Sequence, residues 1–104
     1  MSDKPMTNAR TETKGEGDRT VRVRVEGRVQ GVGFRAWTRR EAEALGLSGR
    51  VRNETDGSVS ALLSGAPDAV AAMLERMRRG PRGAAVTALA VEDAEAPPPP
   101  GFRI

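Results

Sequence analysis

The order in which strand-like and helix-like patterns follow one another restricts the fold of this chain more than any other feature. In the first pattern, Val21, Val23 and Val25 alternate with charged residues, as in a strand that buries one face. The expected elements are a strand from 20 to about 26, a helix over 34–45, strands over 47–53 and 58–64, a helix over 67–79 and a strand over 86–94. This βαββαβ order predicts an α+β, ferredoxin-like sandwich: a mixed, mainly antiparallel sheet with two helices on one face.

Residue types at the ends of these elements support the boundaries. Gly46 suits the residue that ends the first helix, and Thr55-Asp56-Gly57 suits a hairpin turn. Pro67 belongs in the first turn of the second helix. The run Pro97–Pro100 predicts a stiff connection, after which residues 102–104 are expected to add a short edge strand whose pairing stays open.

The expected core contains Phe34 and Trp37 from the first helix and Met73 and Met77 from the second. Glu41 lies on the same stripe as Phe34 and Trp37, so we expect it at the margin of that stripe. Residues 1–18 are polar and of mixed charge, which predicts a disordered N-terminal tail. The remaining residues, 19–104, are expected to form one domain.

The absence of cysteine and histidine from all 104 residues excludes several kinds of chemistry. It rules out disulfides, thiolate nucleophiles, imidazole bases and sites in which Cys or His holds a metal. Any chemistry is left to Arg, Asn, Asp, Glu, Ser, Thr and backbone amides, which bind and orient anions better than they act as covalent nucleophiles. The 17 Lys and Arg against 14 Asp and Glu leave a net charge of only +3, so the sequence does not require a nucleic-acid partner. No stretch predicts a membrane span or a signal peptide, and a cytoplasmic location is expected.

A glycine-rich loop between the first strand and the first helix is the strongest candidate for a binding site. Gly27, Gly31 and Gly33 let the backbone turn tightly, and the free N–H groups of the following helix face the same concavity. Arg35 lies in the first helical turn, where its guanidinium can bind two oxygens of a tetrahedral anion. Spacing alone leaves two interpretations open, a phosphate-binding loop and an ordinary tight turn.

Asn53 ends the second strand, and the predicted topology places the ends of the first and second strands side by side. Its amide could donate to an oxyanion and accept from a water molecule, but it could not act as a base. The alternative is a turn residue that bonds to its own backbone.

Five strings of residues together resemble the acylphosphatase family. They are Gly27-Arg-Val-Gln-Gly-Val-Gly-Phe-Arg35, Ala42-x-x-Leu-Gly-Leu-x-Gly49, Val51-x-Asn53, Asp56-Gly-Ser-Val59 and Gly80-Pro81. The resemblance runs from about residue 21 to 91 and implies hydrolysis of acyl phosphates to a carboxylate and inorganic phosphate. The departure is Arg50, because the family commonly has an aromatic residue at that position.

The resemblance also implies a role for each site residue. The phosphoryl oxygens would bind backbone amides of the loop Arg28, Val29, Gln30, Gly31, Val32 and Gly33. Arg35 would hold the same group, and Asn53 would orient the attacking water. The implied partner is a small-molecule acyl phosphate. The resemblance also implies that no metal and no cofactor is needed, and we expect a monomer.

Three other functions stay open at this point. A ferredoxin-like domain could bind nucleic acid through its arginines, although exposed aromatic residues for stacking are scarce in this sequence. The chain could bind carbamoyl or acyl phosphate without productive release. It could also be a scaffold without catalysis.

Overall fold

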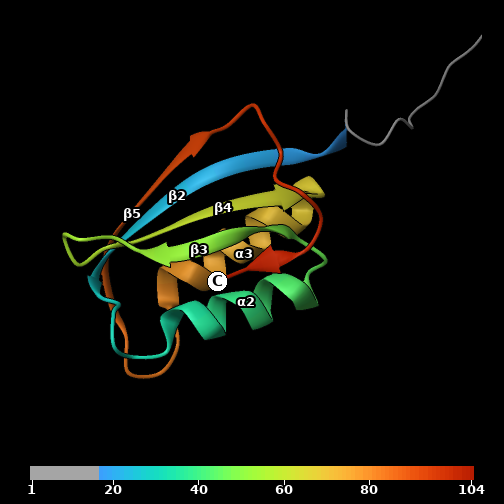
Figure 1. Ribbon diagram of the computed structural model, residues 1–104. Coiled ribbons are helices and arrows are strands. Elements are labelled where there is room, and N and C mark those ends of the chain that lie inside the picture. Colours follow the sequence, from blue (N-terminus) through green and yellow to red (C-terminus); the bar gives the residue numbers. More distant parts are fainter. Residues whose placement is uncertain (1–16) are drawn as a thin grey trace, which may run out of the picture.

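The computed structural model describes residues 17–104, and its helices and strands follow the predicted order (Figure 1). The elements are β2 (Arg19–Arg28), α2 (Phe34–Ala44), β3 (Ser48–Asn53), β4 (Val59–Gly65), α3 (Pro67–Arg79), β5 (Ala85–Asp93) and β6 (Phe102–Arg103). Most boundaries lie within one residue of expectation. The prediction of a disordered tail falls almost wholly on residues outside the described part of the chain.

The five strands form one sheet in the order β5-β2-β4-β3-β6. All neighbours among β5, β2, β4 and β3 are antiparallel, whereas β6 pairs in parallel with β3 through Gly49 and Phe102. The ferredoxin-like prediction is therefore confirmed, and the open question about the last strand is settled as a parallel pairing. Because β2 and β3 are both antiparallel to β4, they run in the same direction. The ends of β2 and β3 thus meet at the same edge of the sheet.

Both helices cover one face of this sheet, and the core lies between the two layers (Figure 1). Val21, Val23 and Val25 are fully buried, so the alternating pattern of the first strand gives the expected inward face. Phe34 is also buried. Trp37 is only half-buried, which corrects its expected place in the core: its ring lies 5.5 Å from that of Phe34 and packs against the margin of the core.

Glu41, the charged residue on the apolar stripe of α2, has a partner in the other helix. Arg76 of α3 donates a hydrogen bond from Nη1 to Oε1 of Glu41 at 2.8 Å. Both side chains are about one third exposed, so the pair lies at the border between the helices and the solvent. Glu41 is thus accommodated at the margin of the stripe as expected, by a contact that sequence spacing did not predict.

The end of β2 is bent toward the candidate site by a bulge. The pairing of β2 with β5 shifts register between Glu26 and Gly27, and Gly27 has a φ of 125°. A Cβ atom at this position would lie 2.1 Å from the carbonyl oxygen of Ala85, so only glycine fits. The strand continues through Arg28, which therefore belongs to β2 and not to the predicted loop.

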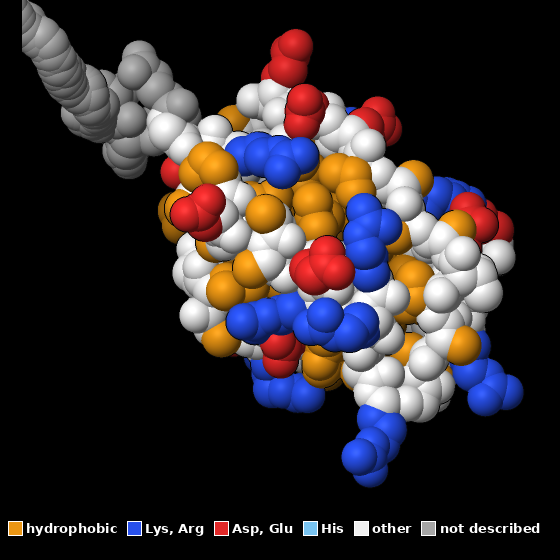
Figure 2. Space-filling view, turned by 180° about the vertical axis from the view of Figure 1, so that it is seen from behind, with side chains coloured by type: hydrophobic (Ala, Val, Ile, Leu, Met, Phe, Trp, Pro, Cys, Tyr) orange, Lys and Arg blue, Asp and Glu red, His pale blue; other side chains and the backbone are white. Residues whose placement is uncertain are grey.

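Charged side chains of both signs are spread over the surface rather than gathered into one basic field. Figure 2 shows one side of the molecule, on which acidic side chains lie between and beside the arginine side chains. This agrees with the small net charge. Within residues 17–104, no helix has the length and apolar character needed to cross a membrane.

Candidate active site

The loop that joins β2 to α2 presents backbone amides at the start of the helix. Gly31 and Gly33 adopt left-handed φ angles of 75° and 78°, a conformation in which successive N–H groups converge. Gly33 caps α2 without a side-chain hydrogen bond, and its carbonyl accepts the first helical bond from the amide of Trp37 at 3.0 Å. The first turn of α2 carries no acidic residue. The loop therefore offers free N–H groups and the positive end of the helix dipole to an anion.

Arg35 and Asn53 line the same hollow, although they come from different elements. The hollow measures about 200 Å³ and lies beside the loop. Its lining consists of Val29, Gly31, Gly33, Phe34, Arg35, Ala36, Asn53 and Ile104. Arg35 comes from the first turn of α2, and Asn53 is the last residue of β3.

The remaining loop residues lie outside the lining of this hollow. Arg28, Gln30 and Val32 do not contribute to it, whereas Val29, Gly31 and Gly33 do. Arg28 is the last residue of β2, and the Gln30 side chain turns toward a different part of the chain. A role of the Arg28, Gln30 and Val32 amides in anion binding stays a prediction.

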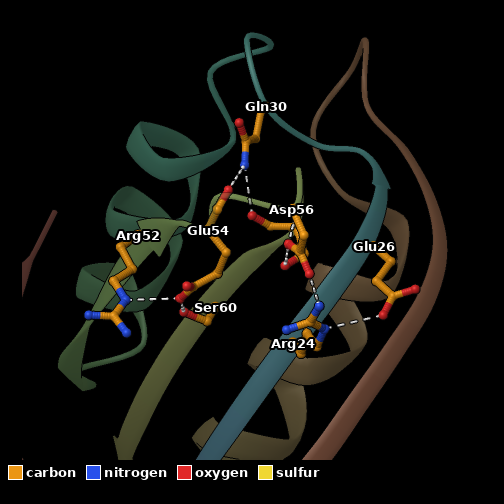
Figure 3. A network of polar contacts seen from close by, with 8 residues as sticks. Arg24, Glu26, Gln30, Arg52, Glu54, Asp56 and Ser60 are labelled. Carbon is orange, nitrogen blue, oxygen red and sulfur yellow. Dashed lines mark hydrogen bonds and ion pairs between the residues drawn. The ribbon is translucent and has the colours of Figure 1, made fainter.

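Gln30 ties the loop to the turn that follows Asn53. Its Nε2 donates to the carbonyl oxygen of Glu54 at 2.8 Å and to that of Ser58 at 2.9 Å (Figure 3). Glu54 is the residue directly after Asn53, so the Gln30 side chain fixes the peptide between Glu54 and Thr55, one residue beyond Asn53, relative to the loop. Sequence reasoning missed this role, and the signal for it was a long amide side chain inside an otherwise apolar, glycine-rich loop.

The turn after Asn53 is held by a second set of contacts around Asp56 (Figure 3). Oδ1 of Asp56 accepts hydrogen bonds from the Ser58 hydroxyl at 2.6 Å and from the Ser58 amide at 3.0 Å, and Oδ2 accepts one from Arg24. These bonds, with the Ser58 hydroxyl first, lower the pKa of Asp56 to about 2. Asp56 and not Asn53 is thus the residue that bonds to the turn backbone.

The amide of Asn53 and the guanidinium of Arg35 are available to a ligand. Among residues 17–104, neither side chain makes a hydrogen bond or an ion pair with another residue. Both are exposed to solvent at the hollow. The interpretation of Asn53 as a self-bonded turn residue is therefore wrong, because the turn is closed without its side chain.

Size alone would not have identified this hollow. A larger hollow, of about 320 Å³, lies beside Arg24, Glu26 and Asp56. There the single guanidinium already contacts two carboxylates, at 3.2 Å for Glu26 and closely for Asp56. That hollow has no free positive charge for an anion, whereas the one beside the loop combines free N–H groups with an unpaired arginine.

Comparison with known proteins gives one consistent result. A family model described as Acylphosphatase matches residues 21–104. An acylphosphatase of Mesorhizobium japonicum is 61% identical over 87 residues, which cover 83% of this chain and 93% of that protein. An acylphosphatase of Rhizobium etli is 64% identical over 75 residues, which cover 72% of this chain and 80% of that one.

Solved structures agree with the sequence comparison. The structure of an acylphosphatase from Coxiella burnetii superimposes with a TM-score of 0.85 at 33% identity, covering 89% of this chain and 98% of that one. The acylphosphatase structure from Bacillus subtilis gives a TM-score of 0.78 at 35% identity, covering 82% and 96%.

Proposed function

Because this chain belongs to the acylphosphatase family, we propose that Arg35, Asn53 and the amides of the glycine-rich loop carry out its reaction. That reaction is the hydrolysis of an acyl phosphate to a carboxylate and inorganic phosphate. The observation that supports these roles is the shared hollow: it joins an unpaired guanidinium, a free side-chain amide and the N-terminus of α2.

In this proposal the phosphoryl group binds at the N-terminus of α2. The loop amides donate to its oxygens, and the two-pronged guanidinium of Arg35 contacts the same oxygens from the first helical turn. Negative charge on these oxygens is redistributed as the phosphorus–oxygen bond breaks. Donors that are already aimed at them stabilise the transition state without reorganising.

Asn53 orients the water that attacks phosphorus. Its carbonyl oxygen accepts from the water while its N–H₂ group donates to a phosphoryl oxygen, so that one amide sets the direction of attack. The bond from phosphorus to the acyl oxygen breaks as the new bond from the water oxygen forms. The carboxylate leaves with the electron pair, and the water proton passes to solvent. Since a carboxylate is a good leaving group, no strong general acid is required.

Ile104 supplies the apolar rim of the hollow, where the acyl part of the substrate is expected to lie. Ile104 is 53% exposed, whereas the other large apolar residues among residues 17–104 are buried or half-buried. Contact with an acyl chain would remove this surface from water.

The test is an assay of the full chain with benzoyl phosphate, with and without EDTA. We expect hydrolysis that EDTA does not diminish and that inorganic phosphate inhibits competitively. Asn53→Ala should fold normally and lower kcat by roughly 10²–10³, as for the loss of one oriented polar group. Wild-type kcat in Asn53→Ala would contradict its role, and loss of activity with EDTA would contradict metal-free hydrolysis.

The described residues do not support the alternative of a nucleic-acid-binding module. Recognition of bases by a ferredoxin-like sheet uses exposed aromatic side chains. In the described residues, Phe34 and Phe102 are buried and Trp37 packs beside Phe34 on α2. That the enzyme is a cytoplasmic monomer stays a prediction of the sequence. Gel filtration and cell fractionation would check it.

A further inference from the structure

The face of the sheet that carries no helix has a basic hollow that the proposed reaction does not use. Where buried valines alternate with exposed residues, β2 presents Arg22 and Arg24 and β3 presents Arg50 and Arg52. Figure 3 shows Arg24 and Arg52 on this face, with the helices behind the strands. The hollow measures about 250 Å³ and runs over β4, and these four arginines line it together with Glu54, Ser60, Ala61 and Leu62. We call it the arginine hollow.

One end of the arginine hollow is already neutralised by carboxylates. Arg24 contacts Glu26 at 3.2 Å and also Asp56, and these bonds raise the pKa of Arg24 further. Arg52 contacts Glu54 at 2.9 Å. The Ser60 hydroxyl and Arg52 together lower the pKa of Glu54, so its carboxylate keeps its charge. This end needs no external anion.

The other end has no such compensation. Arg22 and Arg50 both pair in register with Leu62, so they face each other across β4. Arg103 of β6 stands beside Arg50 in the parallel pairing. Within residues 17–104, no carboxylate lies within 4 Å of these three guanidinium groups, not even that of Glu92, the register neighbour of Arg22 on β5.

The spacing of this uncompensated end suits one multiply charged anion. Strands lie roughly 4.8 Å apart, so the backbones of Arg22 and Arg50 are about 10 Å apart, a distance that two arginine side chains can close over a ligand. The like charges of Arg50 and Arg103, which pair on the neighbouring strands β3 and β6, repel one another, and a bound anion would relieve that repulsion. A tetrahedral phosphoryl group offers more acceptor positions to two or three guanidinium groups than a carboxylate does.

We propose that Arg22 and Arg50, supported by Arg103, bind a phosphoryl group at a second site separate from the catalytic hollow. The two hollows share no lining residue. Among residues 17–104, no exposed aromatic ring lies on this face to stack a base, so the site takes the phosphoryl group of a small anion. Free phosphate and a phosphoryl group at the end of a larger small molecule share this chemistry. Arg50 stands where the family resemblance expects an aromatic residue.

The experiment uses the full chain with Arg35→Ala, which removes the guanidinium of the catalytic hollow. Amide NMR spectra are recorded during titration with inorganic phosphate, and in a second arm with tripolyphosphate. We expect saturable shifts centred on Arg22, Arg50 and Leu62. Tripolyphosphate should bind about tenfold more tightly than phosphate if the site holds a larger phosphorylated molecule, equivalent to one additional charge-assisted contact. Equal affinities would assign the site to free phosphate.

The matched variants remove charge and keep the unbranched side chain. Arg22→Met with Arg50→Met keeps apolar cover over Leu62, which is only 8% exposed, and should abolish the shifts. Arg40→Met with Arg79→Met removes two exposed helix arginines instead and should leave them unchanged. Both proteins are checked for folding by thermal unfolding.

Two outcomes would overturn the proposal. Absent or non-saturating shifts, or shifts lost equally in both double variants, would mean that the arginines only cover Leu62 and make the surface of the sheet hydrophilic. Tighter binding of a single-stranded oligonucleotide than of tripolyphosphate would assign the face to nucleic acid.

Discussion

Gln30→Glu gives the sharpest test of how the loop and the Asn53 turn are held together. The substitution keeps the shape of the side chain, removes both Nε2 donors and places a carboxylate against two carbonyl oxygens, those of Glu54 and Ser58. Each lost hydrogen bond is worth about 1 kcal/mol. Both carbonyl oxygens keep a backbone donor, because the Gly57 amide donates to Glu54 at 3.2 Å and the Glu54 amide donates to Ser58 at 2.8 Å. If misplacement of Asn53 raises the activation free energy by about 2 kcal/mol, kcat falls about 30-fold, since 1.4 kcal/mol is a factor of ten.

The phosphate-binding half of the site should respond much less. Arg35 and the conformation of Gly33 are set by α2, which makes no bond through the Gln30 side chain. We therefore expect the inhibition constant for inorganic phosphate to change by less than about threefold, or about 0.6 kcal/mol. Steady-state kinetics with benzoyl phosphate and phosphate inhibition separate the two quantities.

Two further variants separate positioning from stability. Gln30→Met removes the donors without adding charge and should lower kcat in the same direction by a smaller factor. Arg24→Gln loosens the same turn through Asp56 and leaves the link to the loop intact, so it should lower the melting temperature with kcat retained. Wild-type kcat in Gln30→Glu, or an equal loss of kcat in Arg24→Gln, would refute the positioning role.

Three more predictions concern single side chains. Arg35→Lys should lose most turnover and most phosphate inhibition, because an ammonium lacks the two-pronged geometry; near-normal kinetics would contradict bidentate binding. The native state lowers the pKa of Asp56 from its ordinary value of 3.8 to about 2, so its ionised form stabilises the native state above about pH 4 and this contribution is lost as the pH falls toward 2. Asp56→Asn should therefore flatten the acid dependence of urea unfolding between these values, and an unchanged dependence would show that other carboxylates cause it. Ile104→Ala should raise KM for benzoyl phosphate about threefold, from loss of roughly 0.6 kcal/mol of apolar contact, with little change for acetyl phosphate; equal changes for both substrates would show that the residue does not contact the acyl group.

The fold was largely predictable because short-range patterns and topology agreed. Alternation at Val21, Val23 and Val25 identified the inward face of β2, and the Thr55-Asp56-Gly57 turn fixed the central hairpin. Once the strand order was known, Asn53 had to lie near the loop, because β2 and β3 run in the same direction.

What the sequence did not predict depends on contacts between residues far apart in the chain. The Gln30 side chain bonds to carbonyl groups 24 and 28 positions away, and carbonyl groups carry no sequence signal. Beyond the bulge at Gly27, β2 continues because Arg28 pairs with Ala85, and the half-buried place of Trp37 depends on how α2 lies on the sheet. The same holds for the pair between Glu41 and Arg76.

The two-residue strand β6 limits association of the sheet with a second copy of the chain. Without it, β3 would be the outermost strand, and the backbone groups of Gly49 and Arg50 would be open to a strand from a second molecule. The amide of Gly49 instead donates to the carbonyl oxygen of Gly101 at 2.9 Å. Phe102 then pairs with Gly49, and Arg103 pairs with Arg50. Loss of this short segment would therefore be expected to reduce solubility before it reduced the content of helix and sheet.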